Sequence, residues 1–217
     1  MGLEPEMTQM IEIDGLVHLL EQVRHGRVLI GIAGAPGSGK STITRLIEER
    51  LNKAEAGTAA ILPMDGFHYD DMLLETLGRR GRKGAPATFD VGGFRHILIR
   101  LQANTEDNVA VPVFDRDIEI ARAGARLISK TIRVVLVEGN YLLLRQSPWA
   151  MLKPLFHLTV MVEASLETLQ RRLTARWVDY GLPADEVVRR VEQNDMPNGR
   201  FVITESNPAD YALENNA

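Results

Sequence analysis

The feature that most constrains the fold of this chain is the glycine-rich stretch Gly34-Ala-Pro-Gly-Ser-Gly39-Lys40-Ser41. The apolar run that precedes it, residues 28–33, is typical of a buried strand, and residues 41–51 carry apolar side chains at helical spacing. Glycines allow successive backbone N–H groups to turn inward around a phosphate, and the following helix adds partial positive charge. The order of strand, glycine loop and helix therefore predicts a nucleoside triphosphate site. The alternative is an ordinary glycine-rich turn before a helix.

Two side chains of this stretch have specific roles in the predicted site. The Lys40 ammonium is expected to reach the β- and γ-phosphates, and the Ser41 hydroxyl to take one position on Mg²⁺. ATP and Mg²⁺ are therefore the expected cofactors. The residues expected to bind the nucleotide are Gly34, Ala35, Pro36, Gly37, Ser38, Gly39, Lys40, Ser41 and Thr42.

Composition limits the class of protein in which such a site acts. Of 217 residues, 45% are hydrophobic and 25% are charged, which is ordinary for a globular protein with one domain. A net charge of −4 gives no reason to expect nucleic acid or an anionic membrane as a partner. Without cysteine there are no disulfides and no thiolate nucleophile, which suits the cytoplasm. No apolar run approaches the ~18 residues of a membrane span.

Apolar, β-branched segments alternate with helical patterns along the chain. This alternation predicts an α/β fold, a three-layer sandwich with a mostly parallel central sheet and helices on both faces. The glycine loop makes it one of the phosphate-loop type, for which a small lid is also expected. We expect one domain over residues 1–217, with an acceptor-side loop at about 66–93 and the lid at about 171–200. Strands are expected at 28–33, 59–64, 131–137 and 157–162, an extended segment at 109–114, and helices at 9–25, 41–51, 92–101, 165–179 and 185–193, the last capped by Pro183 and Asp185.

Carboxylates follow three of the predicted strands, at Asp65, Glu138 and Glu163, and ligands of parallel sheets gather beyond the carboxyl ends of the strands. Glu163 precedes a predicted helix, so its charge is expected to complement the N-terminus of that helix. Asp65 is placed to accept the proton of an attacking hydroxyl or to reach Mg²⁺, although an Asp-Gly pair is also a common turn. Glu138 ends the most apolar strand, where a phosphate-loop protein carries its metal-side acid. Because glutamate is longer than the usual aspartate, it is expected to bind the metal directly or through water, or to touch the substrate. A solvated charge is the structural alternative.

Basic residues form two local clusters. On the predicted helix 165–179, Arg172 and Arg176 lie about 40° apart at the edge of the apolar face, whereas Arg171 points away. Two guanidiniums one turn apart are suited to clamping phosphate oxygens during transfer, although nearby acids such as Glu186 could instead pair with them on the surface. Residues 79–84 form a basic, glycine-rich loop, either a lid over an anionic substrate or a solvated segment.

In their order, these motifs resemble the phosphate-loop kinases of the uridine kinase, pantothenate kinase and phosphoribulokinase group, over about residues 28–205. Met64-Asp65-Gly66-Phe67 is similar to the motif whose aspartate is the proposed catalytic base of that group. Residues 83–90 and 111–115 are similar to its acceptor-site motifs. Val137-Glu138-Gly139 looks like the end of its metal-bearing strand, and the arginines of helix 165–179 fit its lid.

A closer resemblance is to a bacterial branch named fructose-transport-system kinases or nucleoside/nucleotide kinase family proteins. Residues 63–69, 137–142 and 194–198 carry it, and Asn194 and Asn198 are expected to shape the lid or the adenine edge. The assignment that the resemblance implies is Lys40, Asp65, Arg172 and Arg176 as catalytic residues, Ser41, Glu138 and Asp65 on the metal side, and His68, Phe89, Asp90, Arg116 and Glu138 at the acceptor.

Two departures from the group bear on the acceptor. Where uridine kinases carry a histidine after the Tyr-Asp of the acceptor motif, this chain has residues 116–119, Arg-Asp-Ile-Glu. Phe114 replaces the tyrosine, which removes a hydroxyl donor. Arg116 and the basic loop suit an anionic acceptor, such as a carboxylate or a sugar phosphate, better than a neutral nucleoside.

We therefore expect an ATP-dependent kinase that phosphorylates a hydroxyl of a nucleoside, a pantothenate-like vitamin or a sugar. No nucleic-acid or membrane partner is expected, and a homodimer is one option for the oligomeric state. The competing hypothesis is a regulatory ATPase associated with sugar transport, which would hydrolyse ATP without a soluble acceptor. A nucleic-acid-processing ATPase is a third option, disfavoured by the acidic balance.

Overall fold

The computed structural model describes residues 8–216. The strands are β1 (Gln9–Met10), β2 (Val28–Gly34), β3 (Ala59–Pro63), β4 (Asn108–Asp115), β5 (Ile120–Ser129), β6 (Val134–Gly139), β7 (Leu158–Glu163) and β8 (Tyr211–Glu214). The helices are α1 (Ile13–Glu21), α2 (Lys40–Ala54), α3 (Asp71–Thr76), α4 (Val91–Ala103), α5 (Leu166–Asp179), α6 (Ala184–Arg190) and α7 (Met196–Glu205), with a π-helical turn (Val191–Asp195) between the last two.

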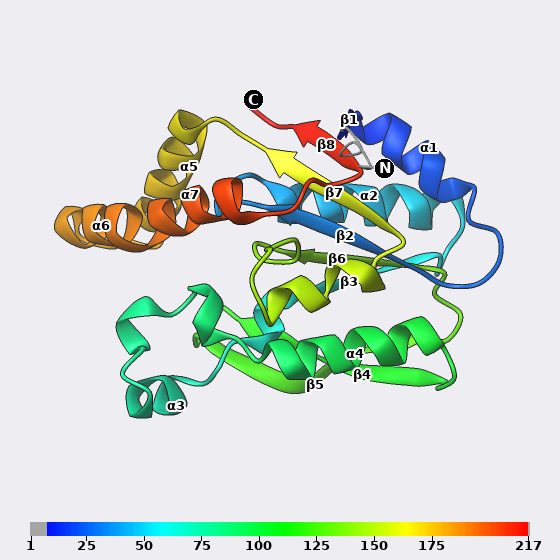
Figure 1. Ribbon diagram of the computed structural model, residues 1–217, viewed down its shortest axis with the longest axis horizontal. Coiled ribbons are helices and arrows are strands. Elements are labelled where there is room, and N and C mark those ends of the chain that lie inside the picture. The colour runs from blue at the N-terminus through cyan, green and yellow to red at the C-terminus, as the bar shows by residue number, and fades with distance from the viewer. Residues whose placement is uncertain (1–7, 217) are drawn as a thin grey trace, which may run out of the picture.

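Six strands pair in parallel, in the order β1-β8-β7-β2-β6-β3. Apolar side chains alternate between the two faces of the sheet. In β2, Ile30 and Ile32 pack with α1 and α2 on one face, whereas Leu29 and Ala33 face α4 on the other. Figure 1 shows the sheet between these helical layers. The predicted α/β fold with a mostly parallel sheet and helices on both faces is therefore confirmed.

Three parts of the chain lie outside the central sheet. The antiparallel pair β4 and β5 packs with α4, and α3 extends from the same side of the molecule. Helices α5, α6 and α7 gather beyond one end of the sheet (Figure 1). Within residues 8–216, no helix is both long enough and apolar enough to cross a bilayer.

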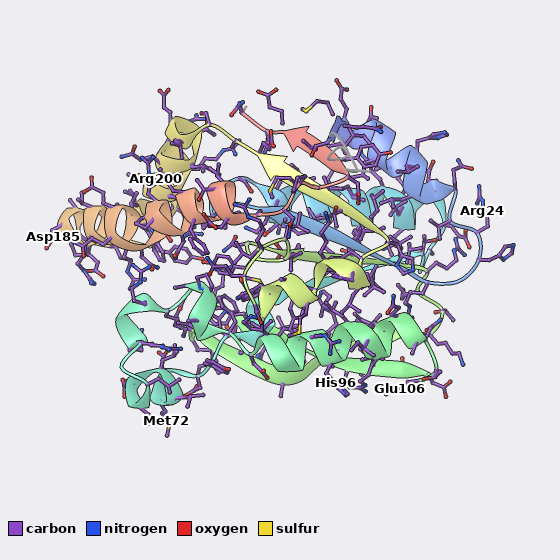
Figure 2. The ribbon with its side chains drawn as sticks, viewed as in Figure 1. Arg24, Met72, His96, Glu106, Asp185 and Arg200 are labelled. Carbon is purple, nitrogen blue, oxygen red and sulfur yellow. The ribbon has the colours of Figure 1, made fainter. Side chains whose placement is uncertain are left out.

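Two local expectations are wrong. The predicted helix over residues 9–25 begins only at Ile13, because Gln9 and Met10 pair in parallel with β8. Asp185 does not cap α6, which begins after Pro183 without a side-chain cap. Asp185 lies instead at the outer tip of this helix (Figure 2).

Asp90 has a structural contact that explains its position in the sequence. It precedes α4, and its carboxylate accepts a hydrogen bond from the Gly93 amide at 2.8 Å. This bond satisfies one of the amide groups that every helix start leaves unpaired. Asp90 therefore fixes where α4 begins.

Replacing Asp90 by alanine is expected to lower the free energy of unfolding by about 1 kcal/mol, the usual cost of losing an N-cap. Asp90→Asn should keep most of that stability, because an amide oxygen also accepts the bond. The measurement is urea unfolding, with the exposed Asp107→Ala as the control. Unchanged stability together with a loss of substrate turnover would show that Asp90 contacts the acceptor rather than capping α4.

Candidate active site

Three neighbouring strands bring the predicted chemical groups together. In the sheet, Glu138 at the end of β6 is opposite Ile32 of β2 on one side and Pro63 of β3 on the other. β2 runs directly into the glycine-rich loop, and Asp65 follows β3 within a short 3-10 turn. The parallel register therefore places the loop, Glu138 and Asp65 at one end of the sheet.

The glycine-rich loop has the backbone that its sequence predicts. Gly37 and Gly39 have φ angles of 82° and 85°, in the left-handed region that side chains disfavour. A Cβ at Gly39 would also overlap the side-chain amide of Asn215. α2 begins at Lys40 with no side-chain cap, so amides of its first turn stay available to an anion.

Two distant side chains hold the loop from outside. The Ser38 carbonyl accepts hydrogen bonds from Arg172 Nη1 at 3.3 Å and from Asn215 Nδ2 at 2.7 Å, and Arg172 also reaches the Gly37 carbonyl at 3.2 Å. Arg172 belongs to α5, and Asn215 follows β8. The sequence analysis anticipated Arg172 but not Asn215, because no local motif marks an asparagine that acts through a contact 177 residues away.

Ser41 and Glu138 adjoin each other at the start of α2. The Ser41 hydroxyl donates a hydrogen bond to Glu138 Oε2 at 3.0 Å. Glu138 is buried, and this burial raises the pKa of its carboxyl. The positive charge of Lys40 acts to lower this pKa but does not outweigh the effect of burial. A cation beside Glu138 would favour the ionised carboxylate and so offset the cost of burying its charge.

The donor set at this position fits Mg²⁺. Hydroxyl and carboxylate oxygens are the hard ligands that Mg²⁺ prefers. Among the described residues, no group of three or more acidic, histidine or cysteine side chains could hold a metal alone. Bound Mg²⁺ would therefore need phosphate and water oxygens as well, which is its usual coordination in phosphate-transfer sites.

Asp65 is paired with an arginine. Its carboxylate lies 2.6 Å from Arg116 Nη2. Burial raises the pKa of Asp65, but electrostatic interactions with His68, Arg116 and Lys40 outweigh burial and hold this pKa below its ordinary value. Burial lowers the pKa of Lys40, although the negative charges of Glu138 and Asp65 act to raise it. Asp65 is therefore an ionised carboxylate.

An aromatic wall stands beside Asp65. The His68 ring lies between Phe89 and Phe114, with centroid distances of 4.0 Å and 4.8 Å, and burial lowers the His68 pKa. Gly66 allows the hairpin to approach, because a Cβ there would lie 2.6 Å from the Pro112 carbonyl oxygen. This close packing brings the end of β4 to the site.

The site opens into one cavity of about 880 Å³. Its wall contains residues 36–37, 39–42, 65 and 68, the basic segment 80–84, the tip of the β4–β5 hairpin and residues from α5 to α7. Of the expected acceptor residues, His68, Phe89, Arg116 and Glu138 line it, but Asp90 does not. Arg172 and Arg176 line it as well, whereas Arg171 does not.

The basic segment is tied to the helical region across the cavity. Arg82 Nη1 donates to the Gln193 carbonyl at 2.9 Å, and Asn194 Nδ2 donates to the Lys83 carbonyl at 3.2 Å. On the inner side, the Tyr141 hydroxyl donates to the Gly84 carbonyl at 2.6 Å. The segment is therefore held as part of the cavity wall.

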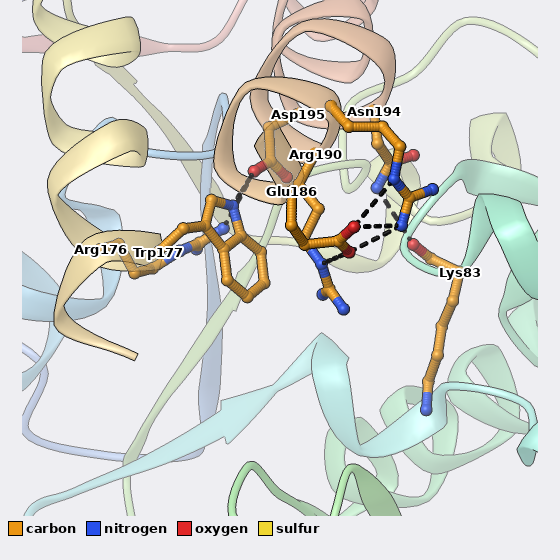
Figure 3. A network of polar contacts seen from close by, with 8 residues as sticks. Lys83, Arg176, Trp177, Glu186, Arg190, Asn194 and Asp195 are labelled. Atoms are coloured by element: carbon orange, nitrogen blue, oxygen red, sulfur yellow. Dashed lines mark hydrogen bonds and ion pairs between the residues drawn. The ribbon is translucent and has the colours of Figure 1, made fainter. Parts of the chain in front are cut away.

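A compact network fixes Arg176 (Figure 3). The Trp177 indole N–H donates to Asp195 at 2.6 Å, and Arg176 Nη2 lies 3.4 Å from the same carboxylate oxygen. The guanidiniums of Arg176 and Arg190 lie 4.7 Å and 4.6 Å from the Trp177 ring centroid, within cation–π range. Asp195, which the sequence analysis did not assign, is thus the partner of Arg176, while Glu186 pairs with other arginines.

Comparisons with known proteins agree with this geometry. Residues 29–212 match the phosphoribulokinase/uridine kinase family. The "Putative uridine kinase C227.14" of Schizosaccharomyces pombe is 31% identical over 99% of this chain and 95% of its own length. The crystal structure of a "putative fructose transport system kinase" from Silicibacter sp. TM1040 is 39% identical, covers 93% of this chain and 98% of its own, and has a TM-score of 0.86.

A further solved structure supports the fold alone. YFH7 from Saccharomyces cerevisiae is 19% identical, covers 94% of this chain and 98% of its own, and has a TM-score of 0.78. The family match extends over the strands that carry the glycine loop, Asp65 and Glu138. The chain therefore belongs to the phosphoribulokinase/uridine kinase family and is a phosphate-loop kinase.

Proposed function

We propose that the protein transfers the γ-phosphate of ATP, with Mg²⁺, to a hydroxyl group of a small-molecule acceptor. The observation that carries this proposal is the convergence of the glycine loop, Glu138 and Asp65 at the ends of three adjacent strands, on one cavity. The aromatic wall gives this cavity a second side, next to Asp65, where an acceptor fits.

Each charged group has a role in such a transfer. Asp65 orients the acceptor hydroxyl and takes its proton, and Lys40 offsets charge on the β- and γ-phosphates. Ser41 and Glu138 hold Mg²⁺, which neutralises charge on the triphosphate when bound. Arg172 and Arg176 stabilise the charge that spreads over the transferred phosphoryl group.

The segments on either side of the cavity are proposed to move with the ligands. Residues of about 171–200 form the lid, and residues of about 66–93 form the acceptor-side loop of a single catalytic domain. The hydrogen bonds between residues 82–83 and 193–194 join the two segments across the cavity, so the proposed movement would exchange these bonds for contacts with the ligands.

A ligand screen tests the proposed function and narrows the acceptor. Nucleosides, pantothenate-like vitamins, sugars and sugar phosphates are tested for thermal stabilisation of the protein in the presence of Mg²⁺ and a non-hydrolysable ATP analogue. Each stabilising compound is then tested for ADP release with ATP. A kinase releases ADP only with its acceptor, whereas fast ADP release without any acceptor would favour the regulatory ATPase.

Asp65→Asn should reduce phosphoryl transfer by ~100-fold or more, because an amide cannot take the hydroxyl proton. Affinity for the ATP analogue should stay within a few-fold of the wild type, since Asp65 contacts no residue of the glycine loop by a hydrogen bond. Steady-state kinetics and nucleotide titration measure the two quantities. Asp14→Asn on the exposed surface of α1 is the control, and undiminished turnover in Asp65→Asn would exclude Asp65 as the base.

Glu138→Gln should raise the Mg²⁺ concentration for half-maximal rate by about tenfold or more, because a carboxylate ligand becomes neutral. The measurement is a Mg²⁺ titration of initial rates at saturating ATP. Glu49→Gln, on the exposed side of α2, should leave the titration unchanged. An unaltered Mg²⁺ requirement in Glu138→Gln would remove Glu138 from the metal site.

Asn215→Ala should weaken binding of the ATP analogue by about threefold to tenfold, the worth of one hydrogen bond that holds the loop in shape. The neighbouring Asn216→Ala is a matched control, because Asn216 bonds to Ser165 and Glu214 and not to the loop. Nucleotide titration of both variants tests the difference. Equal affinity in the two variants would contradict a role of Asn215 in shaping the loop.

A further inference from the structure

The cavity has a charge opposite to that of the chain as a whole. The sequence carries a net charge of −4. Within residues 8–216, however, nine side chains of the cavity wall are cationic and four are acidic. A positive cleft in an acidic protein concentrates anionic ligands. ATP accounts for part of this excess of positive charge, since Lys40 and Arg172 lie at the glycine loop. Bound Mg²⁺ would neutralise part of the negative charge of ATP, so fewer cationic side chains are needed to balance it.

Three further cations of the wall lie away from the glycine loop, in the basic segment. Arg80 and Lys83 share the single carboxylate of Asp71, each at 2.7 Å. Arg82 bonds to a backbone carbonyl and has no ion pair among the described residues. Lys83 also lies 3.9 Å from a carboxylate oxygen of Glu119, so two carboxylates face three cations, which leaves this part of the wall positive.

Lys83 of this segment and Arg116 of the β4–β5 hairpin reach the acceptor side of the cavity. The Lys83 ammonium lies 5.3 Å and the Arg116 guanidinium 6.0 Å from the centroid of the Phe114 ring. Phe114 in turn packs on His68, beside Asp65. A ligand that places a hydroxyl at Asp65 therefore has Arg116 and Lys83 within reach of its other end.

The ion pair between Arg116 and Asp65 obstructs the proposed transfer. The guanidinium engages one oxygen of this carboxylate, Oδ2, and its positive charge makes Asp65 a weaker acceptor for the hydroxyl proton. A second anion beside Arg116 would compete for the guanidinium, and the Arg116 side chain is half exposed and therefore accessible to such an anion. Phosphates and carboxylates are the anions that a guanidinium binds in a bidentate manner.

We propose that the acceptor carries an oxyanion, a phosphate or a carboxylate, in addition to its hydroxyl group, and that Arg116 binds this oxyanion and thereby releases Asp65. This inference rests on the proposed kinase function and specifies its substrate class. It makes Arg116 the residue that distinguishes an anionic acceptor from its neutral analogue.

The transfer step then proceeds with Asp65 free. The hydroxyl oxygen forms a bond to the γ-phosphorus while the bond from that phosphorus to the β,γ-bridging oxygen breaks. The electron pair of the broken bond stays on the β-phosphate of ADP. The hydroxyl proton passes to the Asp65 carboxylate and from there to solvent, and the product is a phosphate ester of the anionic acceptor.

Inorganic phosphate serves as the first probe, because it tests the oxyanion site without knowledge of the acceptor. The protein is saturated with Mg²⁺ and a non-hydrolysable ATP analogue, and its melting temperature is followed in rising phosphate against chloride at equal ionic strength. We expect saturable stabilisation by phosphate. Arg116→Gln should weaken this binding at least tenfold, whereas Arg116→Lys, which keeps the charge, should retain part of it.

Arg122→Gln is the matched control. Arg122 lies on the same hairpin and also pairs with an aspartate, Asp115 at 3.3 Å, but it does not line the cavity. Its phosphate binding should equal that of the wild type. Equal loss of binding in both variants, or no saturable binding by the wild type, would overturn the inference.

Kinetics then test the release of Asp65. Matched compounds, D-glycerate with glycerol and fructose 6-phosphate with fructose, are compared as acceptors in the wild type and in Arg116→Gln. Arg116→Gln should lower the ratio of kcat/KM for the anionic over the neutral compound at least tenfold, with the affinity for the ATP analogue within twofold of the wild type.

The outcomes separate this inference from the proposed function. Turnover of neutral compounds with an unchanged ratio in Arg116→Gln would overturn the anionic acceptor but leave the kinase function intact. A tenfold loss of affinity for the ATP analogue in Arg116→Gln would also overturn the inference, by assigning Arg116 to the nucleotide. Failure of the wild type to bind the analogue would refute the kinase function itself.

Discussion

The parallel pairing of β2, β6 and β3 is the constraint on which the site depends. Glu138 is fixed between Ile32 and Pro63 by backbone hydrogen bonds, so the loop after β2 and the turn after β3 cannot move independently of it. Packing on both faces of the sheet fixes this register, because a slip of one residue would exchange the side chains that face α1 and α2 with those that face α4. The same strand register therefore packs the core and positions the catalytic groups.

Local patterns were sufficient to predict the central part of the molecule. The glycine loop, the strands on either side of Glu138 and the helix that carries Arg172 each have a signal within ten or so consecutive residues. β5 has no such signal, because most of its residues are exposed and it contains Gly124. β8 is four residues long and is defined by its pairing with β7 and β1, which the sequence does not display.

The site residues that sequence reasoning missed share one property. Asn215 and Asp195 act on other groups rather than on a ligand: one holds the carbonyl of Ser38, and the other holds Arg176. No residue type or spacing predicts such contacts, since they arise where segments distant in the sequence meet. Asp90 is the opposite case, a residue that the sequence analysis assigned to a ligand. Its motif resemblance predicted a place at the acceptor, whereas in the structure its carboxylate bonds to Gly93 as a helix cap.

Three arginines of the cavity are held by partners within the protein. Arg172 bonds to loop carbonyls, Arg176 to Asp195, and Arg116 to Asp65. Each ligand must therefore exchange one of these contacts for its own, which lowers affinity but penalises compounds that lack the matching charge. The exchange at Arg116 differs from the others in one respect. Its protein partner is the proposed base, so a ligand that satisfies Arg116 also determines whether Asp65 can act.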